Sequence, residues 1–151
     1  MEKLNRWEKN GYIISTDKHE LDINLIHQFL AKTSWAEGID KETVNLSIEN
    51  SLNFGLYKDS QQIGFARIVT DFTTFGYLCD VFILDDYQGL GLARWMMECC
   101  LEHPQIVKLR RIMLVTTTAP WLYEKTGYSP VKSDNFVWQI VRPDIYKKNK
   151  I

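Results

Sequence analysis

The feature that most constrains the fold is an apolar run that leads through a glycine-containing turn into an amphipathic helix. The run covers residues 81–84, and the turn contains Gly89 and Gly91. After the turn, apolar residues recur with the i, i+3, i+4, i+7, i+8 spacing of one helix face, and Pro104 ends the pattern. This stripe consists of Leu92, Trp95, Met96, Cys99 and Cys100. The segment therefore predicts a buried strand, a tight turn and a helix that packs against the sheet.

The hydrophobic period changes along the rest of the chain, and each change predicts an element. Apolar residues at helical spacing follow Asp22, which is a predicted N-cap, and a second such stretch starts at Asp40. A third covers residues 120–125 and ends just before Gly127. Strand-like runs occupy residues 12–15, 53–57, 62–70, 77–84, 111–116, 128–131 and 136–141. The predicted order is therefore strand, two helices, three strands, helix, strand, helix and two strands.

This order favours a single α/β (α+β) domain over residues 1–151, because helices interleave with a largely meandering set of strands. We expect a mixed, mostly antiparallel central sheet that is flanked by helices on both faces. A chain of 151 residues has the usual size of one domain. The last residues, 144–151, are expected to be frayed.

Charge and cysteine content exclude several classes of protein. The 18 Lys and Arg residues against 19 Asp and Glu residues give a net charge of −1, so no overall basic field exists to attract nucleic acid or an anionic membrane. No window approaches the roughly 18 apolar residues of a membrane span. Three cysteines give no disulfide framework, and Cys99, Cys100 and His103 lack a second ligand pair for a metal. We therefore expect a cytoplasmic protein with no metal, nucleic acid or membrane partner.

The glycine turn is a candidate phosphate site. Backbone N–H groups at the start of a helix are unpaired and lie at the positive end of its dipole. The small residues Gly89, Gly91 and Ala93 would let a diphosphate approach the backbone, and Arg94 would add a charged contact. The turn lacks the third glycine of a dinucleotide fingerprint and the Lys-Ser/Thr end of a Walker A loop. The alternative is a glycine turn that holds no ligand.

The sequence of this turn resembles a motif of a known protein family. Residues 88–93 read Gln-Gly-Leu-Gly-Leu-Ala and resemble the Q/R-x-x-G-x-G/A signature of the GNAT superfamily of acyl-CoA-dependent N-acyltransferases. Residues 77–83 resemble the family's fourth strand, and residues 119–128 are similar to its A-x-x-L-Y-x-K-x-G-F/Y segment. The predicted order of elements is also the family's order. The resemblance covers residues 53–141 by motif and implies a single GNAT-like domain.

The resemblance also implies how the cosubstrate, acetyl-CoA, would be bound. The family holds it in a V-shaped cleft between the fourth and fifth strands. Its pantetheine arm would pair with the backbone of Val81, Phe82 and Ile83. Its pyrophosphate would lie on the amides of Gly89, Leu90, Gly91, Leu92, Ala93 and Arg94, with Gln88 at the first motif position. Without the resemblance, the sequence predicts only the phosphate site at the helix start, and the pantetheine pairing is implied by the family alone.

Asp80 is the favoured general base. Acyl transfer needs a neutral amine, and a lysine-like amine with a pKa of about 10.4 is protonated at neutral pH. Asp80 interrupts an apolar strand, a setting that suits a catalytic carboxylate. Polyamine-type members, which this strand resembles, carry an acidic pair where this chain has Cys79-Asp80, and the first member of that pair is usually the base. Asp71, bulk water, a nucleophilic Cys79 and a purely structural Asp80 are therefore the alternatives.

Tyr123 matches the family's tyrosine near the CoA sulfur, which implies that its phenol protonates the departing thiolate. The alternative is a helix residue that packs beside Leu122. Thr116 stands where the family often has Asn at the end of strand five. Five aromatic residues are treated mainly as structural but are candidates to line an acceptor pocket: Trp7, Trp35, Phe72, Phe75 and Trp138.

These observations predict an N-acetyltransferase that moves an acetyl group from acetyl-CoA to a primary amine by direct attack in a ternary complex. The acceptor would be a small-molecule or peptide amine, and the protein would be a monomer or a homodimer. A catalytically silent acyl-CoA sensor or regulatory module is the first alternative, and a nucleotide-binding protein that uses the same turn is the second.

Overall fold

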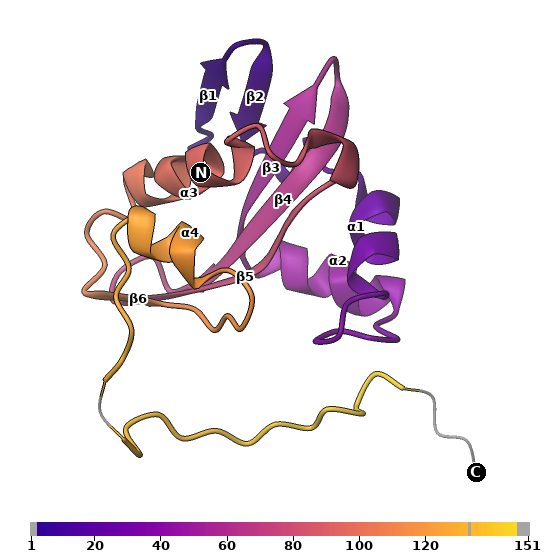
Figure 1. Cartoon of the computed structure of the whole chain (residues 1–151). Helices are drawn as coiled ribbons and strands as arrows, with labels where there is room; N and C mark the ends of the chain where they lie inside the picture. The colour runs from indigo at the N-terminus through magenta and orange to yellow at the C-terminus, as the bar shows by residue number, and fades with distance from the viewer. Residues whose placement is uncertain (1–2, 133, 148–151) are drawn as a thin grey trace.

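A six-stranded sheet forms the centre of the protein (Figure 1). The computed structural model describes residues 3–132 and 134–147. The strands lie side by side in chain order, and every neighbouring pair is antiparallel except the last, β5 with β6, which is parallel. They are β1 (Arg6–Lys9), β2 (Tyr12–Ser15), β3 (Leu52–Lys58), β4 (Gln61–Thr70), β5 (Phe75–Ile83) and β6 (Arg111–Met113). The expected mixed, mostly antiparallel sheet is confirmed.

Helices cover both faces of this sheet, as expected (Figure 1). One layer contains α1 (Ile23–Leu30) and α2 (Lys41–Glu49), and the other contains α3 (Leu92–Glu102) and α4 (Pro120–Lys125). Two short 3₁₀ turns, η1 (Lys18–Glu20) and η2 (Asp85–Tyr87), join helices to strands. The fold is a single α/β domain.

The start of α1 follows from its first residues. The Asp22 side chain accepts a hydrogen bond from the backbone N–H of Leu25 at 3.0 Å, which confirms the predicted N-cap. Asp40 caps α2 in the same way through the N–H of Thr43, at 2.7 Å. These caps satisfy donors that the first helical turn leaves unpaired.

Two buried clusters, one on each face of the sheet, hold the layers together. The α1–α2 cluster includes Ile26 and Val44 of the helices and Phe65 and Phe82 of the sheet. The α3–α4 cluster contains the predicted stripe of α3, with Met96 fully buried, and extends to Leu122 of α4. Since burial of apolar surface is the main favourable term in folding, each helical layer is fixed by its own cluster.

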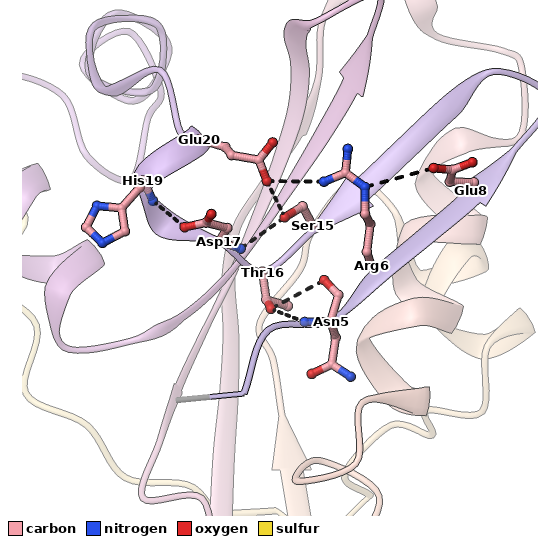
Figure 2. Close-up of polar contacts among 8 residues, drawn as sticks. All are labelled: Asn5, Arg6, Glu8, Ser15, Thr16, Asp17, His19 and Glu20. Atoms are coloured by element: carbon pink, nitrogen blue, oxygen red, sulfur yellow. Dashed lines mark hydrogen bonds and ion pairs between the residues drawn. The ribbon is translucent and has the colours of Figure 1, made fainter. Parts of the chain in front are cut away.

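The sequence interpretation missed β1. Asn10 and Gly11 both have positive φ, 53° and 83°, and they join β1 to β2 as a two-residue hairpin. Asn-Gly is the strongest short hairpin signal, so this strand was predictable. Figure 2 shows polar contacts that hold the hairpin, with Glu20 accepting hydrogen bonds from Ser15 Oγ at 2.7 Å and from Arg6 Nη1 at 3.3 Å.

The two final strands predicted at residues 128–131 and 136–141 are wrong. The described residues after α4 contain no strand, and this segment runs away from the sheet (Figure 1). From Val131 onward its apolar side chains are exposed, Trp138 by 84%, whereas Tyr128 packs on the α3–α4 cluster. A strand needs a partner edge, and β6 ends at Met113 instead of residue 116, so it offers only three residues to pair with. Local β preference alone does not make a strand.

The predicted frayed end, residues 144–151, lies partly outside the described residues, which stop at Lys147. Lys147 itself contacts Asp144 at 2.9 Å and Glu37 of the α1–α2 loop at 3.4 Å. Within residues 3–132 and 134–147, no helix is both long and apolar enough to cross a membrane.

We expect Met96→Ala to lower the free energy of unfolding by about 2–5 kcal/mol, because it opens a cavity in the α3–α4 cluster. Trp138→Ala should change it by less than about 0.5 kcal/mol, because that side chain is exposed. Urea unfolding of both variants measures the difference. If Trp138→Ala lowered the free energy of unfolding as much as Met96→Ala, the C-terminal segment would have to pack into the core.

Candidate active site

The site begins at a β-bulge in the middle of the sheet. Phe65 pairs with Phe82 but Arg67 pairs with Cys79, so β5 carries one extra residue in this interval. Within the bulge, Asp80 has a φ of +55°, a left-handed conformation that Asp tolerates better than most residues. The bulge therefore re-aims the Asp80 side chain relative to a regular strand.

The Asp80 carboxylate is held at both oxygens. Arg67 Nε lies 2.9 Å from Oδ2, and the Trp35 indole N–H donates to Oδ1 at 3.2 Å. The side chains of Arg67 and Asp80 are only 16% and 10% exposed. Arg67 Nη1 also donates to Ser51 Oγ at 2.9 Å. The sequence interpretation did not identify Arg67 or Ser51, and Trp35 was one of five aromatic candidates.

The neighbouring Cys79 is a poor nucleophile. Burial is the main cause that raises the pKa of its thiol to about 12; the Arg67 charge opposes the shift, and the Asp80 charge adds to it. A thiol with this pKa is neutral at pH 7, whereas the thiolate is the reactive form. The structure therefore favours a structural thiol at this position.

Asp71 is poorly suited to the role of alternative base. It lies in the β4–β5 turn, where its carboxylate accepts hydrogen bonds from the Thr74 hydroxyl and from the backbone N–H groups of Thr73, Thr74 and Phe75. These bonds, the Thr74 hydroxyl first, hold the pKa of Asp71 well below its usual range. An exposed carboxylate of this kind remains ionised and holds the turn, and it accepts a proton weakly.

Beyond the bulge, the sheet opens on its β6 side. β6 pairs with β5 only from Phe75 to Tyr77, and no described strand pairs with Cys79–Ile83 on that side. The opposite edge of β5 remains paired with β4 through Phe82 and Ile83. The Phe82 ring is buried and stacks on Phe29 of α1 at 4.0 Å. The half-buried Val81 follows Asp80 within the bulge. The side chains of this segment thus serve packing, while its backbone faces the opening.

The glycine turn follows β5 and starts α3. Gly89 and Gly91 have φ values of +79° and +78°, and a Cβ at either position would meet no atom within 4 Å. Gly91 is the N-cap of α3, and no side chain caps the helix. The open backbone at this helix start is therefore the arrangement that a phosphate requires.

The other residues of the motif have different roles in the turn and differ in their exposure. The Gln88 side-chain amide donates to the Ile83 carbonyl at 2.9 Å, so its role here is to fix the turn. Leu90 is exposed, Leu92 is buried and Ala93 is half-buried. Arg94 is exposed and makes an i,i+4 contact with Glu98 at 3.6 Å, a weak pair that a phosphate could replace.

Tyr123 lies on α4, where its half-buried ring packs against the α3–α4 cluster and meets the Tyr128 ring edge-on at 5.8 Å. Burial raises the pKa of Tyr123 above its ordinary value, so the phenol is a neutral proton donor at pH 7. Thr116 Oγ1 accepts a hydrogen bond from the N–H of Ala119 at 3.2 Å and so shapes the entry to α4.

The predicted site residues thus fall into two groups on the two faces of the sheet. Asp80 contacts Trp35 from the loop between α1 and α2, whereas Tyr123 belongs to the α3–α4 layer. The glycine turn begins α3 in that same layer. The part of β5 that β6 leaves unpaired carries Asp80 itself. Of the other aromatic candidates, Trp7 packs on Phe54 at 6.1 Å and is structural.

Comparisons with known proteins agree with this geometry. The family profile described as "Acetyltransferase (GNAT) domain" matches residues 49–130. A candidate acetyltransferase of Gibberella zeae is 33% identical, over 82% of this chain and 81% of its own. The crystal structure of a candidate GNAT-family acetyltransferase from Xanthomonas campestris pv. campestris is 35% identical and covers 98% of this chain and 99% of its own, with a TM-score of 0.86.

A candidate acetyltransferase of Clostridium acetobutylicum, solved with acetyl-CoA, shares the fold, with a TM-score of 0.62 at 18% identity over 91% of this chain and 96% of its own. The fold, the family profile and two relatives above 30% identity therefore show that this chain belongs to the GNAT acetyltransferase family.

Proposed function

We propose that this protein is an N-acetyltransferase that moves the acetyl group of acetyl-CoA to a primary amine by direct attack in a ternary complex. The observation that carries the proposal is the opening of the sheet beside β5, with a held carboxylate, Asp80, on one face and a neutral phenol, Tyr123, on the other. The acceptor is a small-molecule or peptide amine.

In the proposed complex, acetyl-CoA enters from the α3–α4 layer. The pyrophosphate lies on the backbone from Gly89 to Arg94, where the open helix start provides N–H donors. The pantetheine arm pairs with the backbone of Val81, Phe82 and Ile83, along the part of β5 that β6 leaves unpaired. The solved Clostridium acetobutylicum relative contains acetyl-CoA on the same fold, which supports this choice of cosubstrate.

The reaction then needs three proton transfers. The amine nitrogen attacks the thioester carbonyl carbon, the carbon–sulfur bond breaks, and an amide and the CoA thiolate form. Asp80, directly or through water, takes the proton that makes the ammonium a neutral amine, and it releases this proton to solvent before the next turnover. Tyr123 donates a proton to the thiolate, and the second amine proton returns to the phenol through solvent. Because separate groups serve nitrogen and sulfur, neither has to do both tasks.

The phosphate site is tested by ligand-induced stabilisation. Acetyl-CoA should raise the melting temperature of the wild type, whereas ATP and NAD should not. Gly91→Glu should abolish this shift, because it places a carboxylate at the open backbone. Gly91→Ala is the matched control, because it brings the same strain at φ +78° without the charge. Normal acetyl-CoA binding by a folded Gly91→Glu protein would place the phosphate site elsewhere.

Thiol release from acetyl-CoA, measured against a panel of primary amines, tests the activity itself. In this assay Asp80→Asn should lower turnover by roughly 10²- to 10⁴-fold and remove the acidic limb of the pH profile, with the KM for acetyl-CoA nearly unchanged. The control is Asp59→Asn, an exposed residue that also has positive φ, +50°. An unaltered pH profile in Asp80→Asn would assign the proton transfer to water. Binding of acetyl-CoA without turnover of any amine would favour the sensor alternative.

Tyr123→Phe keeps the ring and removes the hydroxyl, so kcat should fall about 10-fold or more while the KM for acetyl-CoA stays constant. The loss should shrink with an acyl donor whose thiol is a better leaving group. Tyr128→Phe removes the neighbouring hydroxyl and is the control. A higher KM at unchanged kcat would make Tyr123 a cofactor-packing residue.

A further inference from the structure

A chain of polar contacts joins the Asp80 bulge to three other parts of the fold. Arg67 of β4 contacts Asp80 Oδ2 through Nε and donates to Ser51 Oγ through Nη1, both at 2.9 Å. Ser51, which is buried beyond the end of α2, donates in turn to the Ser47 carbonyl at 2.7 Å. Trp35 completes the chain at Oδ1.

The two oxygens of the Asp80 carboxylate have unlike partners. Oδ2 faces a guanidinium that is 16% exposed and fixed at two nitrogen atoms, so this contact is charge-assisted and permanent. Oδ1 faces a neutral indole N–H at the longer distance of 3.2 Å, from a residue that is 58% exposed. An incoming amine can displace the Trp35 contact at far lower cost than the Arg67 contact.

We propose that Arg67 is a positioning residue that presents Asp80 Oδ1 to the acceptor, and that Trp35 occupies this oxygen until the acceptor amine displaces its N–H. The proposal rests on the N-acetyltransferase function proposed above. It makes the α1–α2 loop, which carries Trp35, part of the acceptor site. Oδ1 is the oxygen that receives the amine proton, while Oδ2 stays bound to Arg67 throughout.

The two residues should affect different kinetic constants. Arg67→Gln frees the carboxylate to turn, so kcat should fall by about 10²-fold with no change in the KM for acetyl-CoA, and Arg67→Lys should restore part of the loss. Trp35→Phe keeps an aromatic ring but removes the competing donor. The KM for the amine should therefore fall about two- to ten-fold, the worth of one long, solvent-exposed hydrogen bond.

The test is a set of variants assayed with acetyl-CoA and whichever of benzylamine, spermidine or a lysine-containing peptide the wild type turns over best. When Asp80 is already replaced by Asn, adding Arg67→Gln should lower kcat little further, because Arg67 acts through Asp80. Arg6→Gln is the matched control, because it removes an Arg–carboxylate pair, Arg6 with Glu20, that lies outside the site (Figure 2). Trp138→Phe controls for the loss of an exposed indole N–H.

If the losses of kcat from Arg67→Gln and Asp80→Asn were additive in the double variant, the positioning role of Arg67 would be overturned. An unchanged or raised KM for the amine in Trp35→Phe would overturn the proposal that the amine displaces the Trp35 N–H. In either case the N-acetyltransferase function would stand, because the wild type turns over amine. No turnover of any amine by the wild type would overturn both proposals. If Arg67→Gln does not fold, Arg67→Lys replaces it, and a wild-type kcat in that folded variant also overturns the positioning role.

Discussion

The ion pair between Arg67 and Asp80 is the interaction on which the arrangement of the site depends. A carboxylate that is 10% exposed in the middle of a sheet is unfavourable unless charged and hydrogen-bonding partners surround it. Arg67 supplies the charge, and Trp35 and Ser51 complete the hydrogen bonds of the pair. Because these partners come from β4, from beyond the end of α2 and from the α1–α2 loop, the pair also ties one helical layer to the strand that carries Asp80.

The bulge at Asp80 connects this pair to the shape of the sheet. β5 carries an extra residue here, and its pairing with β6 has already ended at Tyr77. The strand then continues, still paired with β4, to the turn where Gly89 and Gly91 adopt positive φ. One strand therefore carries the held carboxylate, an unpaired backbone edge and the approach to an open helix start. In the proposed complex, this order brings the cosubstrate and the acceptor to one point.

Local patterns in the sequence predicted the parts of this arrangement that local physics determines. The Asp22 N-cap, the apolar stripe of α3 and the glycines of the turn all follow from residues within a few positions of one another. The missed hairpin strand β1 had such a local pattern in Asn10-Gly11. The final strands were wrong because pairing requires an edge, and the length of β6 is a tertiary property. Arg67 and Trp35 were not predictable as partners of Asp80, because 13 and 45 residues separate them from it.

The placement of Asp80 and Tyr123 on different faces has a consequence for the proposed chemistry. A single group that served both nitrogen and sulfur would have to be unprotonated when the amine arrives and protonated when the thiolate leaves. Two groups avoid this requirement, since the Asp80 carboxylate is held by Arg67 and Trp35, while burial raises the pKa of the Tyr123 phenol and keeps it neutral. The Tyr123 phenol is therefore in the protonation state that its step needs before either substrate binds. In this arrangement, the opening between β5 and β6 only has to place the thioester carbon between them.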